Sequence, residues 1–254
     1  MNIIACYKIV PDEKDIQVRS DRSISIDKAE WVIGQYDLNA VEAAMQIYEA
    51  VGGKVTALSV GDRQLENSKL KKGVLSRGPQ ELFLVIDEAL SGADTNLTAR
   101  ALAAAARKIG FDLIICGEGS QDLYSQQVGI QLGQILNVPT LNAVSRIVAE
   151  NGKLIVERSL EDEVEVLEVS LPAVISVTTD INQPRIASMK DILAAGKKPV
   201  TQWSLADVGL NDANRRTEIL YTLAPEQAER KRIILEGESE EVLDKFYELL
   251  RKAI

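Results

Sequence analysis

Histidine is absent from this sequence of 254 residues. Histidine is the usual general base near neutral pH and the commonest transition-metal ligand. Without it no Ser/His/Asp triad or Cys/His pair can form, and hydrolases and zinc enzymes are disfavoured. Asp, Glu, Lys, Tyr and Cys remain available for catalysis. The composition nevertheless favours a binding or carrier protein, and we assign no catalytic residue and no metal ligand.

Cysteines and clustered basic residues are also scarce. Cys6 and Cys116 both lie in apolar, strand-like segments, which suits reduced and buried thiols better than a disulfide framework, although the sequence alone leaves a bridge open. The formal net charge is −9, from 38 acidic and 29 basic side chains. Because no long run of Lys and Arg is present to neutralise a row of phosphates, we do not expect a nucleic-acid partner.

Long apolar runs are missing as well. No segment approaches the length that a membrane-spanning helix requires, so we expect no membrane insertion. The first residues, MNIIACYKIVPD, lack the basic region, the apolar core and the cleavage site of a signal peptide. We therefore expect a cytoplasmic protein. Its length is sufficient for one full-sized hydrophobic core.

Four apolar segments alternate with helical patterns in the first half of the sequence. They are NIIACYKIV, KVTALSV, ELFLVI and FDLIIC. Between them, helical patterns run from Asp37, the expected N-cap, to Gly52, then up to about Arg77, and from about Asn96 to Ile109. Apolar strands that alternate with helices are typical of a parallel sheet covered on both faces. We expect an α/β fold built on a doubly wound, mostly parallel, Rossmann-like sheet.

A different pattern follows in the second half. The stretch KLIVERSLEDEVEVLEVSL alternates polar and apolar residues around an acidic turn, which predicts a β-hairpin insertion with one solvent-exposed face. PAVISVTT predicts another buried strand. Beyond Trp203 apolar residues become sparse until a final amphipathic helix from about Ser239. We expect a core domain over residues 1–202 and an extended C-terminal arm over residues 203–254.

The stretch GEGSQDLYSQQVG, residues 117–129, lies between the apolar segment FDLIIC and the helical pattern IQLGQIL. Glycines allow close approach of the backbone to a ligand, and a helix that begins after a strand presents free N–H groups to an anion. In doubly wound sheets, ligands bind at the carboxyl ends of strands, so the loops after Val10, Val60 and Cys116 are candidates. The stretch matches neither the Walker loop nor the dinucleotide fingerprint. From the residues alone, a binding loop and a plain tight turn remain equally open.

Several segments of the chain resemble the β-subunits of electron-transfer flavoproteins, and within that family the FixA-type branch. The resemblance is nearly full length. It includes QYDLNAVEAA, ALSVG, the loop GEGSQDLYSQQVG and, most specifically, VERSLEDEVEVLEVSLPAVISVTTDINQPRIASMKDILAAGKKPV. The last run joins a hairpin with an arginine, a Leu-Pro-Ala strand, an Asn-x-Pro-Arg turn and a basic cluster in one order.

The resemblance implies an electron-carrier subunit, and not an enzyme, that works in a heterodimer. A FixB-type α-subunit would carry the redox-active FAD, and this chain would hold a structural AMP. Gly117 and Gly119 would admit the nucleotide, and N–H groups near residues 125–128 would hold its phosphate. The residues that the resemblance assigns to the nucleotide are Cys6, Gly34, Gln35, Tyr36, Asp37, Val60, Gly117, Gly119, Asp122, Ser125, Gln126, Gln127 and Val128.

The resemblance also implies partner flavoprotein dehydrogenases, recognised by Met189 with Lys197 and Lys198. Some relatives place a second FAD in the nucleotide pocket and have a DGDT-like stretch where this chain has QDLYSQQ, which favours AMP here. The C-terminal arm would contact the α-subunit. Two alternatives remain: a stand-alone adenine-nucleotide-binding or nucleotide-hydrolysing α/β protein, and a redox enzyme that binds FAD by itself.

Overall fold

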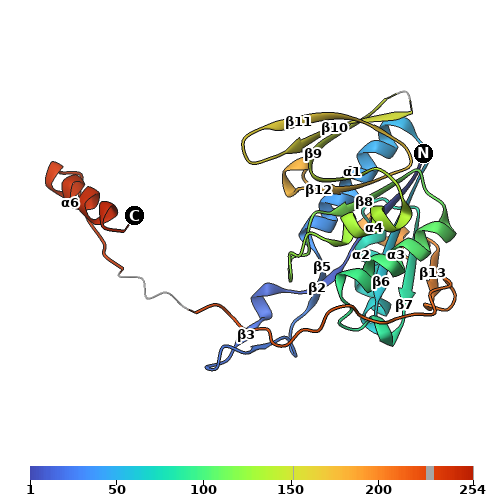
Figure 1. The fold of residues 1–254 in the computed structure, drawn as a ribbon, viewed down its shortest axis with the longest axis horizontal. Helices are drawn as coiled ribbons and strands as arrows, with labels where there is room; N and C mark the ends of the chain where they lie inside the picture. Colours follow the sequence, from blue (N-terminus) through green and yellow to red (C-terminus); the bar gives the residue numbers. More distant parts are fainter. Residues whose placement is uncertain (151, 227–231, 254) are drawn as a thin grey trace. The chain divides into compact units, whose positions relative to one another are not determined.

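The computed structural model describes residues 1–150, 152–226 and 232–253, and in these ranges nine strands form one large sheet (Figure 1). The chain divides into two compact units, which are described separately. The larger comprises Met1–Gln17 and Ser25–Tyr221, and the smaller comprises Val18–Ile24 and Thr222–Ile254.

The elements follow one another in the expected alternation. Up to residue 117 they are β1 (Asn2–Cys6), β2 (Ile9–Pro11), β3 (Gln17–Val18), β4 (Ile24–Ser25), β5 (Trp31–Ile33), α1 (Gln35–Val51), β6 (Lys54–Gly61), α2 (Ser68–Leu75), β7 (Glu81–Ile86), α3 (Thr95–Ile109) and β8 (Leu113–Gly117). Then come α4 (Val128–Leu136), β9 (Thr140–Glu150), β10 (Lys153–Ser159), β11 (Val164–Ser170), β12 (Ala173–Val177), α5 (Met189–Ala195), β13 (Val200–Trp203) and α6 (Glu240–Arg251). Short 3-10 turns occupy Glu13–Asp15, Arg63–Glu66, Glu88–Leu90 and Thr179–Ile181.

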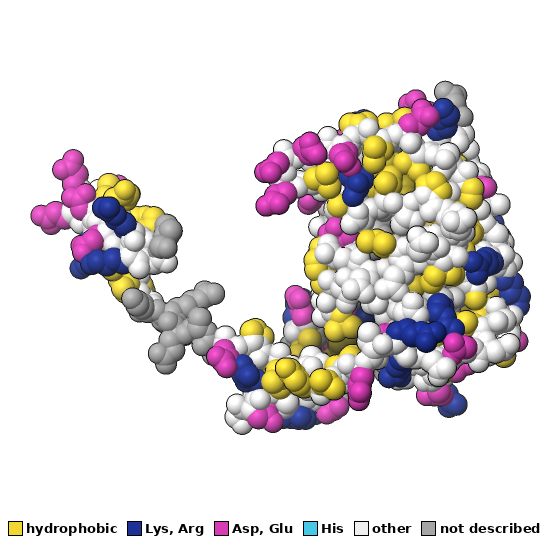
Figure 2. All heavy atoms as spheres, viewed as in Figure 1, with side chains coloured by type: hydrophobic (Ala, Val, Ile, Leu, Met, Phe, Trp, Pro, Cys, Tyr) yellow, Lys and Arg dark blue, Asp and Glu magenta, His cyan; other side chains and the backbone are white. Residues whose placement is uncertain are grey.

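The large sheet has the strand order β11-β10-β9-β12-β8-β1-β6-β7-β13. Every pairing from β9 to β13 along this order is parallel, whereas β10 pairs antiparallel with both β9 and β11. The mostly parallel α/β sheet and the hairpin insertion are thus confirmed. Strands β9 and β13 were not predicted, and β11 forms one edge of the sheet. The acidic turn of the hairpin, Glu161–Glu163, is exposed, and acidic side chains gather there in Figure 2.

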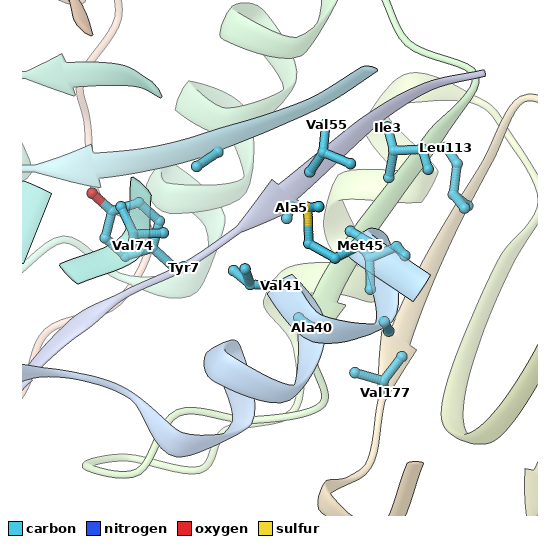
Figure 3. Close-up of a cluster of buried hydrophobic side chains, with 14 of the residues drawn as sticks. Ile3, Ala5, Tyr7, Ala40, Val41, Met45, Val55, Val74, Leu113 and Val177 are labelled. Atoms are coloured by element: carbon cyan, nitrogen blue, oxygen red, sulfur yellow. The ribbon is translucent and has the colours of Figure 1, made fainter. Parts of the chain in front are cut away.

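Alternating side chains of the central strands face two helical layers. Ile3 and Ala5 of β1 pack in the cluster that contains residues of α1 and α2, whereas Ile4 and Cys6 pack in the cluster with α3 and α4. Figure 3 shows the first cluster, in which Met45 of α1 lies among side chains of the central strands. Because both faces are covered, both side-chain registers of the strands must be apolar, which explains their nearly continuous apolar sequences.

Helix α1 begins earlier than expected. Its N-cap is Gly34, and Asp37 lies inside the first turn, so the prediction of Asp37 as N-cap is wrong. A Cβ at Gly34 would lie 2.7 Å from Asp37 Oδ2, which explains why a residue without a side chain occupies the cap. The end of the helix at Gly52, which has φ 75°, agrees with the expectation.

The expected domain boundary after residue 202 does not coincide with the division between the two units. Residues 203–221 belong to the larger unit, where Leu205 is only 4% exposed and packs in the α3 cluster.

In the smaller unit, Arg22 Nη1 lies 2.9 Å from Glu226 Oε1. Helix α6 starts after Ser239, as expected, and a groove of about 390 Å³ is lined by Ile233, Leu235, Phe246, Leu249 and Leu250. Residues 227–231 and 254 of the expected arm lie outside the described residues.

None of the helices within residues 1–150, 152–226 and 232–253 combines the length and the apolar composition that crossing a bilayer requires.

The central strands predict a large stability cost for a core truncation. Leu113 of β8 is fully buried in the α1 cluster, so Leu113→Ala should lower the free energy of unfolding by about 2–5 kcal/mol. Ile186→Ala is the matched control, because Ile186 is 95% exposed and its truncation should cost less than about 0.5 kcal/mol. Urea unfolding followed by circular dichroism measures both. Equal midpoints for the two variants would contradict the assigned core.

Candidate functional site

The topology of the sheet changes direction between β1 and β8. From β1 the chain passes through α1 to β6 on one side, and it later returns to pair β8 with the other side of β1. Ligand sites in open α/β sheets lie at the carboxyl ends of strands at such a point. Cys6 and Gly117 end these two strands, and Val60 lies near the end of β6 at the same edge. Cys6 and Cys116 are buried free thiols.

Asp37, in the first turn of α1, connects this helix to the ends of β1 and β8. Its carboxylate Oδ2 accepts a hydrogen bond of 2.9 Å from the backbone N–H of Lys8, after β1, and the carboxylate also accepts one from the backbone of Gly117 at the end of β8. The side chain is almost completely buried. Burial raises the pKa of Asp37 to about 7, against the opposing effect of these hydrogen bonds and of the nearby Lys8 ammonium. Asp37 is therefore a buried acid that titrates near neutral pH.

Two glycines expected at the nucleotide permit close protein packing. A Cβ on Gly117 would lie 2.7 Å from Tyr36 Cβ and 3.0 Å from Asp37 Oδ1. A Cβ on Gly119 would lie 2.4 Å from a ring carbon of Tyr124. Gly117 therefore lets the first turn of α1 approach β8, and Gly119 makes room for the Tyr124 ring. Their contact with a nucleotide stays a prediction.

The loop between β8 and α4 is fixed to α1 and β1 by side chains. Lys8 Nζ forms an ion pair of 2.6 Å with Asp122. Burial opposes the charge of Asp122, but the hydrogen bonds and charge of Lys8 together with the hydrogen bonds from Ser120 and Leu123 outweigh it, so the pKa of Asp122 lies below its ordinary value. The rings of Tyr36 and Tyr124 lie 5.3 Å apart between centroids. Tyr124 also donates a 2.7 Å hydrogen bond to Glu118.

The part of the loop nearest α4 is exposed to solvent. Residues 121–127 are exposed, and Tyr124 and Gln126 adopt positive φ angles of 44° and 54°. Helix α4 has Gln127 as its N-cap with no side-chain hydrogen bond to the cap. Within the described part of the chain, no acceptor is found for the backbone N–H groups of Ser125, Gln126 and Gln127. These donors and the positive end of α4 form an arrangement that suits a phosphate or another anion.

The expected partner-recognition residues lie on a different segment. Met189 begins α5 and is 73% exposed, and Lys197 is exposed as well. Lys198 has another environment: its ammonium donates to the carbonyl oxygens of Leu75 at 2.8 Å, Gly78 at 3.1 Å and Pro79 at 2.7 Å. Burial lowers the pKa of Lys198. The structure therefore uses the Lys198 charge within the chain, at the C-terminal end of α2.

Sequence reasoning missed two side chains of the site, Lys8 and Tyr124. Lys8 provides a backbone donor for Asp37 and the ion pair with Asp122. A single lysine within the apolar segment NIIACYKIV was the available signal. For Tyr124, the available signal was an aromatic side chain in a mostly polar loop.

A comparison with known protein families matches residues 23–208 to the family described as the electron transfer flavoprotein domain. The match spans well over half of the chain. The chain belongs to the electron transfer flavoprotein family. Membership associates it with flavoproteins that carry electrons and with assembly in their complexes, which confirms the family expected from the resemblance. The β-subunit assignment, the FixA-type branch and the bound nucleotide stay predictions.

Asp37 predicts a specific dependence of stability on pH. Its pKa of about 7 in the folded chain lies above the ordinary carboxyl value of 3.8, so between these pH values the folded chain holds a proton that the unfolded chain releases. The free energy of unfolding therefore falls as pH rises through this window. Relative to Asp37→Asn, the wild-type value should fall by about 2–3 kcal/mol from pH 5 to pH 8.

Chemical denaturation of both proteins across this pH range measures the effect. The charged or titratable groups that face Asp37 are Lys8, Asp122 and the thiol of Cys6, and all are kept in the variant. Asp162→Asn, in the exposed hairpin turn, controls for the loss of one acidic group. A constant difference between wild type and Asp37→Asn across the pH range would rule out the raised pKa.

Proposed function

We propose that this chain is the β-subunit of a heterodimeric electron-transfer flavoprotein of the FixA type. It holds AMP at the carboxyl edge of the sheet, supports a FixB-type α-subunit that carries FAD, and docks flavoprotein dehydrogenases so that electrons pass to a further acceptor. FAD supplies the electron chemistry when it is bound to that partner. The observation that carries the proposal is the free backbone edge of residues 125–127, at the topological switch point of an electron transfer flavoprotein chain.

The residues of this edge fit a nucleoside monophosphate. The N–H groups of Ser125, Gln126, Gln127 and Val128 would hold the phosphate. Cys6, Val60 and the first turn of α1 supply the apolar and backbone surroundings at the adjacent strand ends. A Cβ on Gly117 would collide with α1, and a Cβ on Gly119 would collide with Tyr124. The nucleotide would therefore lie against the backbone of the loop.

The charges of the loop favour AMP over a hydrolysed triphosphate. Residues 117–128 contain no lysine or arginine, and the nearby Lys8 ammonium is already paired with Asp122. Phosphoryl transfer from ATP requires cations or metal ions that neutralise the transferred group. A nucleotide-hydrolysing protein is therefore the weaker alternative. A second FAD in this pocket is disfavoured by the segment QDLYSQQ, as argued from the sequence.

An exposed apolar surface supports partner docking. We call Ile186, Met189, Ile192 and Leu193 the docking surface; they are 95%, 73%, 41% and 70% exposed. Exposed apolar side chains that cluster on one segment mark interaction sites. A small surface of this kind suits a transient complex with dehydrogenases, in which one or two anchors dominate the affinity.

The heterodimer is supported by the smaller unit. Leu243, Phe246, Tyr247 and Leu250 of α6 are all at least 42% exposed. An amphipathic helix with an uncovered apolar face needs a partner surface in water. We propose that this unit covers part of the α-subunit.

The phosphate position predicts that Gln127→Glu weakens AMP binding. Gln127 Oε1 accepts hydrogen bonds from Thr95 at 3.0 Å and Gln131 at 3.1 Å, and a glutamate oxygen can accept both, so the loop should keep its conformation. The added charge repels the phosphate, and affinity should fall about tenfold or more. Calorimetry with AMP on nucleotide-stripped protein measures it. Gln202→Glu, at an exposed position of β13, adds the same charge elsewhere, and equal affinities in the two variants would contradict the placement.

The smaller unit predicts a selective effect of truncation. Removing residues 222–254 deletes most of the smaller unit but leaves the larger unit and residues 18–24 unchanged in sequence. The protein should therefore remain folded and keep AMP. It should no longer co-purify with a co-expressed FixB-type α-subunit. Removal from Leu205 is the contrasting variant, because it deletes a buried core residue and should lower the melting temperature. Retained α-binding by the 222–254 deletion would overturn the role of this unit.

The alternatives differ in simple observables. A nucleotide-hydrolysing protein would turn over ATP when purified alone, and a redox enzyme that binds FAD by itself would be yellow. The proposed β-subunit, purified alone, should neither hydrolyse ATP nor be yellow.

A further inference from the structure

Helix α5 displays its apolar residues without burying them. It has seven residues, Met189–Ala195, and only Ala195 is buried. Isolated helices of this length are unstable in water, and helices in proteins are usually stabilised by burial of an apolar face. Burial contributes little here, because Met189, Ile192 and Leu193 are exposed. Other interactions must therefore hold the docking surface in its conformation.

The first such interaction is at Arg185, just before the docking surface. Arg185 Nε donates to Glu42 Oε2 at 2.7 Å, Nη2 donates to Glu42 Oε1 at 3.1 Å, and Nη1 donates to Glu49 at 2.7 Å. The backbone N–H of Arg185 also donates to Glu42. The Glu42 side chain is 7% exposed. Burial opposes its charge, but the hydrogen bonds from Arg185 outweigh it and hold the pKa of Glu42 below its ordinary value.

The second interaction is at Lys198, just after the docking surface. Its ammonium donates to three carbonyl oxygens, those of Leu75, Gly78 and Pro79. Leu75 is the last residue of α2, so the lysine satisfies a carbonyl at the negative end of that helix. The hydrogen bonds connect the segment to α2 and to the turn that precedes β7.

Between these two charges, the start of α5 is fixed locally. Ser188 and Asp191 form a capping box: the backbone N–H of Ser188 donates to Asp191 Oδ2 at 3.0 Å, and the N–H of Asp191 donates to Ser188 Oγ at 3.3 Å. The box sets where the helix begins but contacts no other element. The orientation of α5 on the larger unit therefore depends on Arg185 and Lys198, together with the packing of the one buried α5 side chain, Ala195, in the core cluster.

We propose that Arg185 and Lys198 are positioning residues for partner recognition, which mount the docking surface on α1 and α2 so that its apolar side chains face a partner in one fixed arrangement. This inference rests on the proposed docking function. It changes the role of Lys198 from a partner contact to an internal support. Preorganisation of a loop raises affinity because less conformational entropy is lost on binding.

Hydrogen exchange of the chain alone gives the first test. Arg185→Gln and Lys198→Met should each speed amide exchange in residues 189–195 about tenfold or more, because each removes charged hydrogen bonds. Amides of β1 and β8 should keep their exchange rates. Lys153→Gln is the control, since it breaks an exposed ion pair with Glu168 far from α5 in sequence.

Arg185→Gln leaves the buried Glu42 without its partner and can unfold the chain. The double variant Arg185→Gln with Glu42→Gln removes both charges and should restore the melting temperature towards wild type. It should still show fast exchange in α5. Unchanged α5 exchange in this double variant, or in Lys198→Met, overturns the proposal.

Electron transfer separates positioning from general stability. A flavin dehydrogenase that reduces the reconstituted heterodimer serves as the probe. In the double variant and in Lys198→Met, the half-saturating concentration of dehydrogenase should rise about tenfold while the maximal rate stays unchanged. An unchanged half-saturating concentration overturns the proposal. Met189→Ala tests the docking function itself: if it has no effect on half-saturation, the docking surface is wrongly assigned, whatever the exchange experiment shows.

Discussion

The carboxylate of Asp37 is the contact on which the candidate site depends. It receives backbone hydrogen bonds from the ends of β1 and β8, the two strands between which the sheet changes direction, while its own backbone is in the first turn of α1. Gly34 and Gly117 have no side chains, and this allows the helix and the strands to come that close. The position of the loop 118–127 follows from this junction, because Lys8 and Tyr36 hold Asp122 and Tyr124.

Helix α1 connects the proposed nucleotide site with the proposed docking surface. Asp37 faces the strand ends, Asn39 is 1% exposed and donates to the Asn182 side chain and backbone, and Glu42 holds Arg185. Two proposed functional regions that lie far apart in the sequence thus share one supporting helix. The buried polar side chains of α1 are all hydrogen-bonded, which specifies a single arrangement of the segments around it.

The sequence was sufficient for the layered fold because each central strand is apolar on both faces, and FDLIIC and ELFLVI can hardly form anything else. The candidate loop was found for the same reason, since sheet topology dictates where ligands bind. The Asp37 junction was not predictable: an aspartate before an apolar helix normally caps it, and only tertiary contact shows that Gly34 does so here. The Arg185–Glu42 pair spans 143 residues, and no local pattern reveals such a partner. Lys198 looked like a surface lysine because its acceptors are backbone carbonyls, which every sequence contains.

The edge strand β11 carries a risk of association between identical chains, and its charges counteract this risk. Val164 and Val166 are 59% and 63% exposed on a strand whose outer backbone edge has no partner among the described strands. Such edges promote stacking of identical chains into fibrils, in which each residue lies on its own copy. In this chain an in-register stack would place the acidic turn Glu161–Glu163 against the same carboxylates of the next molecule. The hairpin therefore resists polymerisation by electrostatic repulsion, and because mobile ions screen such repulsion, its colloidal stability depends on ionic strength.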